Sequence, residues 1–246
     1  MKLILLRHGE SEWNLENRFT GWKDVGLTER GRQEALFSAK QLIQQNLKIC
    51  TIHTSLLKRA IQTTEIIIDK LNFPKKEIKL DWRLNERHYG ALQGLNKSET
   101  AKKYGEEKVL LWRRSYDIVP PLLLENDERH PKFNNKFKDI DCDLPIGESL
   151  KNVIERLSPF LDDYMDFIKN NPGNHLIVAH SNSLRAIIKI LDKLSEKEII
   201  SVNIPTGVPL VYSLDNNLNV VKKEYLLDED ELKEKQNIVA NQGKAK

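Results

Sequence analysis

The sequence predicts an α/β fold, a three-layer α/β/α sandwich with a mostly parallel central sheet. Two observations predict it. Short runs of continuous apolar residues, such as residues 3–6 and 176–179, lack the polar alternation of half-exposed strands and so favour strands buried on both faces. Amphipathic segments with apolar residues at helical spacing follow such runs along the chain. Strands that alternate with helices are typical of a parallel sheet covered by helices.

The first part of the chain predicts alternating strands and helices. After the strand at residues 3–6, a polar loop rich in glycine leads to a helix that Thr28 caps and that runs to Gln45. Three further elements follow in order: a buried strand, an amphipathic helix, and a strand that leads into a loop, over residues 48–55, 56–71 and 77–94.

The remainder of the chain has one irregular part and then returns to the same alternation. Residues 96–115 predict a helix, and residues 122–143 carry many charges and few periodic apolar positions, which indicates an irregular excursion. Residues 148–170 predict a long amphipathic helix with Glu148 at its start. Residues 172–191 predict a strand followed by a helix, and residues 207–214 and 219–227 are strand candidates.

We expect one domain over residues 1–246. It contains an irregular insertion at about residues 96–147, and residues 230–246 form a flexible tail whose composition is typical of disorder. Lys and Arg number 39 against 36 Asp and Glu, so the formal charge of +3 does not predict a nucleic-acid surface but permits a local pocket for a small anion. Two cysteines give no disulfide framework, and no apolar stretch is long enough to span a membrane. These features predict a soluble, cytoplasmic protein.

Two apolar strands end in histidine. Residues 3–8 (LILLRH) and 176–180 (LIVAH) each place a His where a strand gives way to a polar turn. Because ligands collect at the carboxyl ends of parallel strands, we expect His8 and His180 to face one space if the strands are neighbours, with Arg7 and Arg59 entering the same crevice. Guanidinium groups match the oxygens of a phosphate dianion, and the helix after His180 adds backbone donors.

Four segments carry a resemblance to a known family. The Arg7-His8-Gly9 turn lies in residues 6–35, and the other segments are residues 57–66, 83–97 and 176–189. Together they resemble the 2,3-bisphosphoglycerate-dependent phosphoglycerate mutases of the histidine phosphatase superfamily, from the first strand to about Leu214. The resemblance implies interconversion of 3-phosphoglycerate and 2-phosphoglycerate in glycolysis and gluconeogenesis, through a phosphohistidine, with 2,3-bisphosphoglycerate as the phosphoryl primer.

The same resemblance implies roles for individual residues. His8 would be the nucleophile, Glu86 the acid and base for the leaving and attacking oxygens, and Arg7, Arg59 and His180 would neutralise the phosphoryl oxygens. The substrate-binding residues that it implies are Ser11, Asn14, Thr20, Gly21, Tyr89, Lys97, Arg113, Arg114 and Asn182. One departure stands out, because Ser181 follows His180 where the family usually has Gly.

Other interpretations, without a role in phosphoryl transfer, stay open for several of these residues. Without the resemblance, Arg113 and Arg114 would be a solvated helix face, and Glu86 with Arg87 an ordinary surface pair. His8, His180 and Glu86 would also satisfy a two-histidine, one-carboxylate metal site. Two nearby arginines disfavour a divalent cation, so we expect no metal.

Three functional interpretations fit these residues. The same pocket would serve a phosphatase if water attacked the phosphohistidine, and a silent phospholigand-binding protein would require the loss of a catalytic group. A mutase needs a basic clamp that retains the intermediate, and Lys97, Arg113 and Arg114 supply one. The sequence therefore predicts a mutase that acts on small phosphoglycerates, binds neither nucleic acid nor membrane, and forms a homo-oligomer, a dimer or tetramer, as its relatives commonly do.

Overall fold

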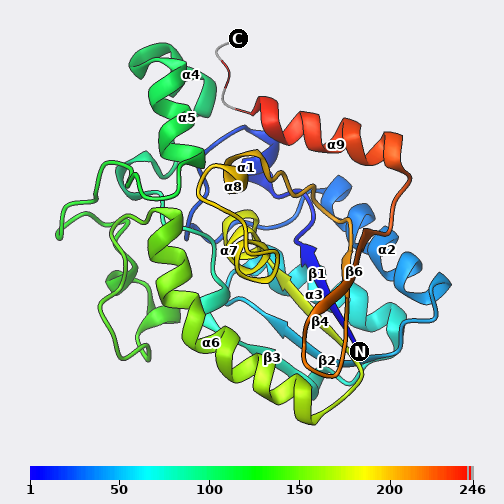
Figure 1. Ribbon diagram of the computed structural model, residues 1–246. Coiled ribbons are helices and arrows are strands. Elements are labelled where there is room, and N and C mark those ends of the chain that lie inside the picture. Colours follow the sequence, from blue (N-terminus) through cyan, green and yellow to red (C-terminus); the bar gives the residue numbers. More distant parts are fainter. Residues whose placement is uncertain (243, 245–246) are drawn as a thin grey trace.

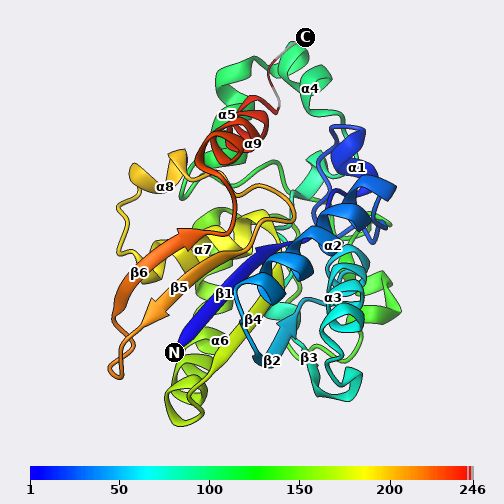
Figure 2. The ribbon, with the colours of Figure 1, turned by 90° about the vertical axis from the view of Figure 1, so that its right-hand side faces the viewer.

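A six-stranded sheet lies at the centre of the computed structural model, which describes residues 1–242 and 244 (Figure 1; Figure 2). Its strand order is β3-β2-β4-β1-β5-β6, with parallel pairing from β3 to β1 and antiparallel pairing for the last two strands. The strands are β1 (Lys2–Arg7), β2 (Ile49–Thr54), β3 (Ile78–Leu80), β4 (Asn174–Ala179), β5 (Leu210–Leu214) and β6 (Val220–Tyr225). The predicted mostly parallel sheet is confirmed.

Helices cover both faces of the sheet and give it three layers (Figure 2). Successive side chains of a strand point to opposite faces. In β1, Leu3 and Leu5 belong to one core cluster, and Ile4 and Leu6 belong to the other. The first cluster includes residues of helices α6 (Leu150–Asn170) and α7 (Ser181–Leu191), and the second those of α2 (Glu29–Gln44) and α3 (Lys58–Leu71). The continuous apolar runs are therefore strands buried on both sides, as the sequence predicts.

Two helix starts follow from side-chain caps. The Thr28 hydroxyl accepts a hydrogen bond from the Gly31 N–H at 3.0 Å, as the sequence predicts for an N-cap. Helix α6 begins one or two residues later than the predicted Glu148, because Ser149 caps it by accepting from the Asn152 N–H at 3.2 Å. Glu148 is thereby left outside the helix.

The segment that was expected to insert over the site contains two short helices. Residues predicted as one helix form α4 (Lys97–Tyr104) and α5 (Glu106–Arg114), with a break at Gly105, whose φ of +87° suits glycine. Residues 122–143 contain only the 3-10 turns η4 (Pro131–Phe133) and η5 (Asn135–Phe137), in line with the predicted irregular excursion.

The predicted disorder of the tail is wrong for residues 230–241, which belong to helix α9 (Glu229–Asn241). The Asp228 carboxylate caps it by accepting from the N–H groups of Asp230 and Glu231. Near the other end of the helix Val239 is buried, so packing against the rest of the protein stabilises a segment whose composition alone predicts disorder. Figure 1 shows α9 at the same end of the molecule as α4 and α5. Residues 243, 245 and 246, which the expectation also included, lie outside the described residues.

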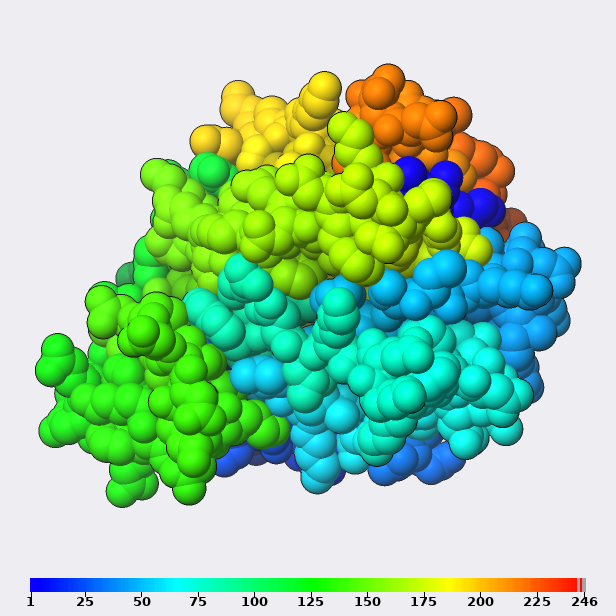
Figure 3. Space-filling view, turned by 90° about the horizontal axis from the view of Figure 1, so that it is seen from below, coloured from blue at the N-terminus to red at the C-terminus, as the bar shows by residue number. Residues whose placement is uncertain are grey.

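The opposite end of the molecule carries the amino terminus and the long helix α6, as Figure 3 shows from below. The remaining short elements are α1 (Glu12–Leu15), η1 (Lys75–Glu77), η2 (Trp82–Leu84), η3 (Gly90–Leu92) and α8 (Glu198–Ser201). In the part of the chain that the structure describes, no helix is both long and apolar enough to cross a membrane.

Candidate active site

The two histidines that end β1 and β4 lie side by side. The register pairs Arg7 with Ala179, and the His8 N–H donates to the Ala179 carbonyl at 3.0 Å. The ring centroids of His8 and His180 are 4.9 Å apart. Parallel pairing therefore brings both imidazoles to one edge of the sheet, as we expected from the two strand endings.

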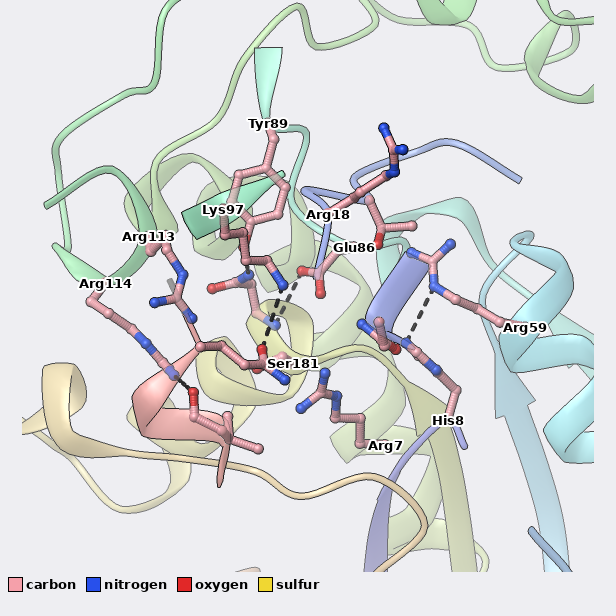
Figure 4. A pocket seen from close by; sticks show the side chains of 15 residues that line it. Arg7, His8, Arg18, Arg59, Glu86, Tyr89, Lys97, Arg113, Arg114 and Ser181 are labelled. Atoms are coloured by element: carbon pink, nitrogen blue, oxygen red, sulfur yellow. Dashed lines mark hydrogen bonds between the residues drawn. The ribbon is translucent and has the colours of Figure 1, made fainter. Parts of the chain in front are cut away.

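Two hydrogen bonds fix the tautomer of His8. The Gly9 carbonyl lies 2.7 Å from Nδ1, and since a carbonyl can only accept, Nδ1 carries the hydrogen. The Arg59 Nε–H donates to Nε2 at 3.2 Å, so Nε2 presents its lone pair (Figure 4). Burial, then the charges of Arg59 and Arg7, hold the pKa of His8 well below its usual 6.5. His8 is therefore a neutral imidazole with a lone pair in the pocket.

A close backbone contact explains the glycine after His8. A Cβ at Gly9 would lie 2.1 Å from the Gly31 carbonyl oxygen at the start of α2, far inside van der Waals contact. The Gly9 N–H in turn donates to Thr63 Oγ1 at 3.1 Å, which ties the turn to α3. The turn that presents His8 is thus held by both helices on that face of the sheet.

Two buried arginines flank the imidazoles. Arg59 donates to the carbonyls of Gly21 and Lys23 at 2.9 and 3.0 Å, and burial lowers its pKa to about 10. Arg7 donates to the Ile204 carbonyl at 2.7 Å, while its Nε atom is buried without a hydrogen-bond partner. Both guanidiniums remain charged at neutral pH, and backbone carbonyls hold each of them in place.

His180 is buried and only partly satisfied. Its Nε2 atom lies 2.7 Å from Ser55 Oγ, and its Nδ1 atom has no partner among the described residues. Burial, followed by the charges of Arg59, His8 and Arg7, lowers its pKa well below 6.5. An unpartnered buried ring nitrogen beside His8 is suited to meet an oxygen of a bound phosphoryl group.

Glu86 approaches from the loop after β3. One carboxylate oxygen accepts from the N–H groups of Arg87 at 2.7 Å and Asn182 at 3.1 Å, the second of which lies at the start of α7. The Asn182 side chain donates to the Tyr89 hydroxyl at 3.2 Å. The carboxylate is thus held against the first turn of the helix that follows His180, and it lines the pocket in Figure 4.

The pocket itself is small, polar and cationic, with about 530 Å³ of empty space including its mouth. The residues that line it are Arg7, His8, Asn14, Arg18, Thr20, Arg59, Glu86, Tyr89, Lys97, Arg113, Arg114, Ser181, Asn182, Val239 and Gln242. Six of them are cationic against one carboxylate. Within the described residues, only Arg18 of these six forms an ion pair, with Glu16. Such a pocket has unpaired positive charge and favours a multiply charged anion.

Burial and mutual repulsion act strongly on the cations from the insertion. Burial, then the charges of Arg113, Arg7 and Arg114, lowers the pKa of Lys97 well below 10.5. Burial also lowers the pKa of Arg113 to about 10. These groups come from α4 and the end of α5, on the opposite side of the pocket from His8 (Figure 4).

Most of the residues expected at the site line this one pocket, and three do not. Ser11 is buried and caps α1, where its hydroxyl accepts from the Asn14 N–H at 3.3 Å. Gly21 offers its carbonyl to Arg59, and His180 lies behind the pocket surface, beside His8. Contact with substrate stays a prediction for all of the expected residues, those that line the pocket included.

The sequence did not single out Arg18, Val239 and Gln242 as site residues. Arg18 is held by the Gly94 carbonyl at 2.9 Å. Helix α9 brings Val239, whose carbonyl accepts from Arg114 at 3.3 Å, and Gln242, whose side chain accepts from Lys97 at 3.5 Å. No local pattern in the sequence signals these contacts, because the partners are 76 to 145 positions apart.

A metal site was the main chemical alternative. In residues 1–242 and 244, no group of three or more His, Cys, Asp or Glu side chains is arranged to hold a metal ion. The charges around the candidate ligands are positive, which raises the cost of binding a cation there.

Comparison with known proteins identifies the superfamily and the fold of this chain. The model of the histidine phosphatase superfamily (branch 1) matches residues 3–125 and 123–223. A solved structure of a mycobacterial glucosyl-3-phosphoglycerate phosphatase, 24% identical, superposes with a TM-score of 0.68 over 86% of this chain and 92% of that chain. A structure titled mycobacterial hydrolase 1, 21% identical, gives 0.69 over 91% and 95%. These structures share the fold.

Two curated relatives define the narrower family. The 2,3-bisphosphoglycerate-dependent phosphoglycerate mutase of Hydrogenobaculum sp. (strain Y04AAS1) is 50% identical over 244 residues, 99% of each chain. The enzyme of the same name from Lachnoclostridium phytofermentans is 50% identical over 245 residues, 99% of this chain and 98% of that one. The chain therefore belongs to the histidine phosphatase superfamily and, within it, to the family of these two mutases.

Proposed function

We propose that this protein is an enzyme that interconverts 3-phosphoglycerate and 2-phosphoglycerate through a phosphohistidine at His8, primed by 2,3-bisphosphoglycerate. The single observation that carries the chemistry is the orientation of His8, whose Nε2 lone pair faces a pocket that contains unpaired cations. The proposed substrate comes from the names of two relatives that are 50% identical over nearly the whole chain.

The first chemical step is attack by His8. The Nε2 lone pair forms a bond to phosphorus while the bond between phosphorus and the ester oxygen breaks. Arg7 and Arg59 in the pocket wall, with His180 beside His8 behind that wall, would stabilise the charge of the phosphoryl oxygens, which is the main contribution a protein makes to phosphoryl transfer. The Nδ1–H bond to Gly9 holds the ring and stabilises positive charge as it develops on the imidazole.

The second requirement is a proton for the oxygen that leaves. Glu86 gives its proton to that alkoxide and takes one from the hydroxyl that attacks the phosphohistidine in the reverse direction. Two backbone N–H groups fix one of its oxygens, which leaves the other to exchange the proton. Reorientation of the glycerate between the two transfers converts the 3-phosphate into the 2-phosphate.

The fit to the primer rests on charge. A bisphosphorylated glycerate carries two phosphates and a carboxylate, and the pocket offers cations on both sides. Arg7 and Arg59 would hold the phosphate at His8, while Lys97, Arg113 and Arg114 would hold the other acidic groups. The proposal includes no metal, because the arginines supply the positive charge that a metal would bring to the transferred group.

Four further parts of the proposal follow from the family. Ser11, Asn14, Thr20, Gly21, Tyr89 and Asn182 bind substrate together with the cations. The chain is one domain in which the segment of about residues 96–147 covers the site. It works in the cytoplasm, where glycolysis and gluconeogenesis run. It assembles as a homo-oligomer, a dimer or tetramer, which light scattering at several protein concentrations would test.

One assay tests the function directly. Conversion of 3-phosphoglycerate to 2-phosphoglycerate is measured in the presence of a chelator, with and without catalytic 2,3-bisphosphoglycerate, while released phosphate is followed. We expect conversion that survives the chelator, depends on the bisphosphate and releases little phosphate. Dominant release of phosphate would make the protein a phosphatase, and absence of turnover would leave a binding protein.

A further inference from the structure

The loop that carries Glu86 has little regular structure of its own. Between β3 and α4 it contains only the 3-10 turns η2 and η3. Glu86 lies between these turns and is almost fully buried. Because buried backbone groups need partners that a helix or sheet would otherwise supply, something else must hold this stretch of chain.

A buried ion pair outside the pocket supplies those partners. Arg156, on α6, donates from Nε and Nη2 to the two carboxylate oxygens of Glu148 at 2.7 and 3.1 Å. Their side chains are only 7% and 4% exposed. Neither residue lines the pocket, so neither is placed to touch substrate. Two buried charges in bidentate contact form a rigid unit, since the guanidinium fork matches the carboxylate.

The pair contacts the backbone on both sides of Glu86. On the amino-terminal side, Arg156 donates to the carbonyls of Arg83 at 2.6 Å and Asn85 at 3.3 Å. On the carboxyl-terminal side, the His88 N–H donates to the Glu148 carboxylate at 2.7 Å, and the Glu148 N–H donates to the His88 carbonyl at 2.9 Å.

Two tryptophans complete the support. The guanidinium of Arg156 lies 5.8 Å from the ring centroids of both Trp22 and Trp82. The Trp22 indole N–H donates to the Glu86 carbonyl at 2.6 Å. The ion pair is therefore packed among rings that themselves contact the catalytic loop, which limits its movement.

We propose that the Glu148–Arg156 pair is a positioning device that holds Glu86 at the distance from His8 that proton transfer requires. This inference rests on the proposed function of Glu86 as acid and base. The pair acts through the backbone at residues 83, 85 and 88, and its own atoms never touch substrate. A displacement of about 1 Å at a reacting group is enough to cost roughly a hundredfold in rate.

The rival explanation is that the pair only stabilises the fold. The two explanations differ in how the pair couples to Glu86. A positioning pair loses its importance once the Glu86 carboxyl is gone, whereas a general stabiliser contributes the same factor with or without it. A double-mutant cycle between the pair and Glu86 therefore separates them.

The experiment compares Glu148→Gln and Arg156→Lys with the wild type, each alone and combined with Glu86→Gln. For the single variants we expect kcat for the mutase reaction to fall about a hundredfold, with KM for 3-phosphoglycerate within roughly threefold. In the Glu86→Gln background, the same changes should lower kcat by less than about threefold relative to Glu86→Gln alone. Equal losses in both backgrounds would overturn the proposal.

A matched control addresses stability. Ile168→Ala removes a fully buried core side chain near the far end of α6, about 18 Å along the helix from Arg156, so it destabilises the fold at a distance from the loop of Glu86. We expect it to lower Tm and keep kcat. If Ile168→Ala lowers kcat as much as Glu148→Gln at the same loss of Tm, the pair is structural and the proposal fails.

A crystal structure of Glu148→Gln, or of the milder Glu148→Asp if the first does not fold, decides the matter independently of activity. We expect the backbone at Glu86 to move away from His8, and an unmoved loop would refute the proposal. A wild type without mutase activity would instead refute the proposed function, and the displacement measurement would still test the role of the pair.

Discussion

His8 and Arg59 share a hydrogen bond in which the guanidinium Nε–H of Arg59 donates to the Nε2 lone pair of His8 at 3.2 Å. The same lone pair is the one that attacks phosphorus in the proposed mechanism. Arg59 thus holds the ring ready while the site is empty, and the proton on Nδ1 is held by Gly9. In the proposed mechanism, an incoming phosphoryl group takes over the contact with Arg59 when it reaches His8.

Replacement of His8 by alanine removes the nucleophile. We expect mutase activity to fall at least about a thousandfold, because no other group in the pocket offers a lone pair in this position. The measurement is the coupled mutase assay together with acid-quenched labelling by radioactive 2,3-bisphosphoglycerate, which should give no labelled protein. His53→Asn is the control, since His53 is equally a buried histidine but does not line the pocket. Full turnover by His8→Ala would rule out the covalent mechanism.

Replacement of Arg59 by lysine keeps one charge and loses the planar fork. Arg59 contacts His8 and two backbone carbonyls at once, which an ammonium on a flexible stem cannot reproduce. We expect kcat to fall about a hundredfold in the mutase assay. Lys58→Arg, at the exposed neighbouring position of α3, is the control and should leave kcat unchanged. Equal kcat for Arg59→Lys and wild type would show that charge alone suffices there.

The sequence predicts the two central histidines of this site because the patterns that indicate them are local in the chain. A continuous apolar run identifies a strand buried on both faces, and parallel strands must bring their carboxyl ends together. His8 and His180 follow directly from these two facts. The resemblance adds Glu86, Lys97, Arg113 and Arg114, which the apolar pattern does not single out.

The contributions of α9 could not be predicted because they are tertiary. The tail has the charged composition of a disordered segment, and Val239 is one of the few apolar residues that could fix it. Its burial and the hydrogen bond from Arg114 to its carbonyl depend on a surface built by other parts of the chain. The break at Gly105 was missed for a similar reason, since an isolated glycine is tolerated inside many helices.

Buried histidines predict loss of stability in acid. Burial lowers the pKa of His88 to about 3 and of His53 to about 4, while both titrate near 6.5 when unfolded. Between those values the unfolded chain binds more protons, so stability falls as the pH drops below about 6.5. From pH 8 to pH 4 we expect a loss of about 3 kcal/mol from each. Urea unfolding at a series of pH values measures it.

A variant tests the assignment of this acid effect. His53→Gln removes one titrating ring, so the fall in unfolding free energy between pH 6.5 and pH 4 should be shallower than in the wild type. His88 keeps its own contribution in that variant. Identical pH dependence in the two proteins would show that His53 does not contribute.

Unpaired cations in the pocket predict that anions stabilise the protein. Lys97, Arg113 and Arg114 make no ion pair within the described residues, and burial together with their neighbours' charges lowers the pKa of Lys97. Inorganic phosphate should raise Tm more than chloride does at equal ionic strength. At a phosphate concentration of a hundred times its Kd, the free energy of unfolding should rise by about 2.7 kcal/mol. Lys97→Met should reduce this gain, while Lys102→Met, on the exposed side of α4, should not. A gain that Lys97→Met leaves intact would place the anion elsewhere.

Helix α9 closes one side of the pocket through Val239 and Gln242, which contact Arg114 and Lys97. A mutase must keep its bisphosphorylated intermediate in place while the glycerate turns, and must keep water from the phosphohistidine. We therefore expect truncation after Asp230 to lower mutase activity more than phosphatase activity. The ratio of 2-phosphoglycerate formed to phosphate released, in one reaction mixture, measures the effect.

The truncation needs a control that leaves the contacts of the helix intact. Glu234→Ala changes an exposed side chain on α9, away from Arg114 and Lys97, so the ratio should stay at the wild-type value. Gln242→Ala removes only the contact to Lys97 and should shift the ratio part of the way toward phosphate. If truncation lowers both activities by the same factor, α9 supports the fold of the site but does not act as a lid, because a lid protects the intermediate from water and its loss must favour hydrolysis over transfer.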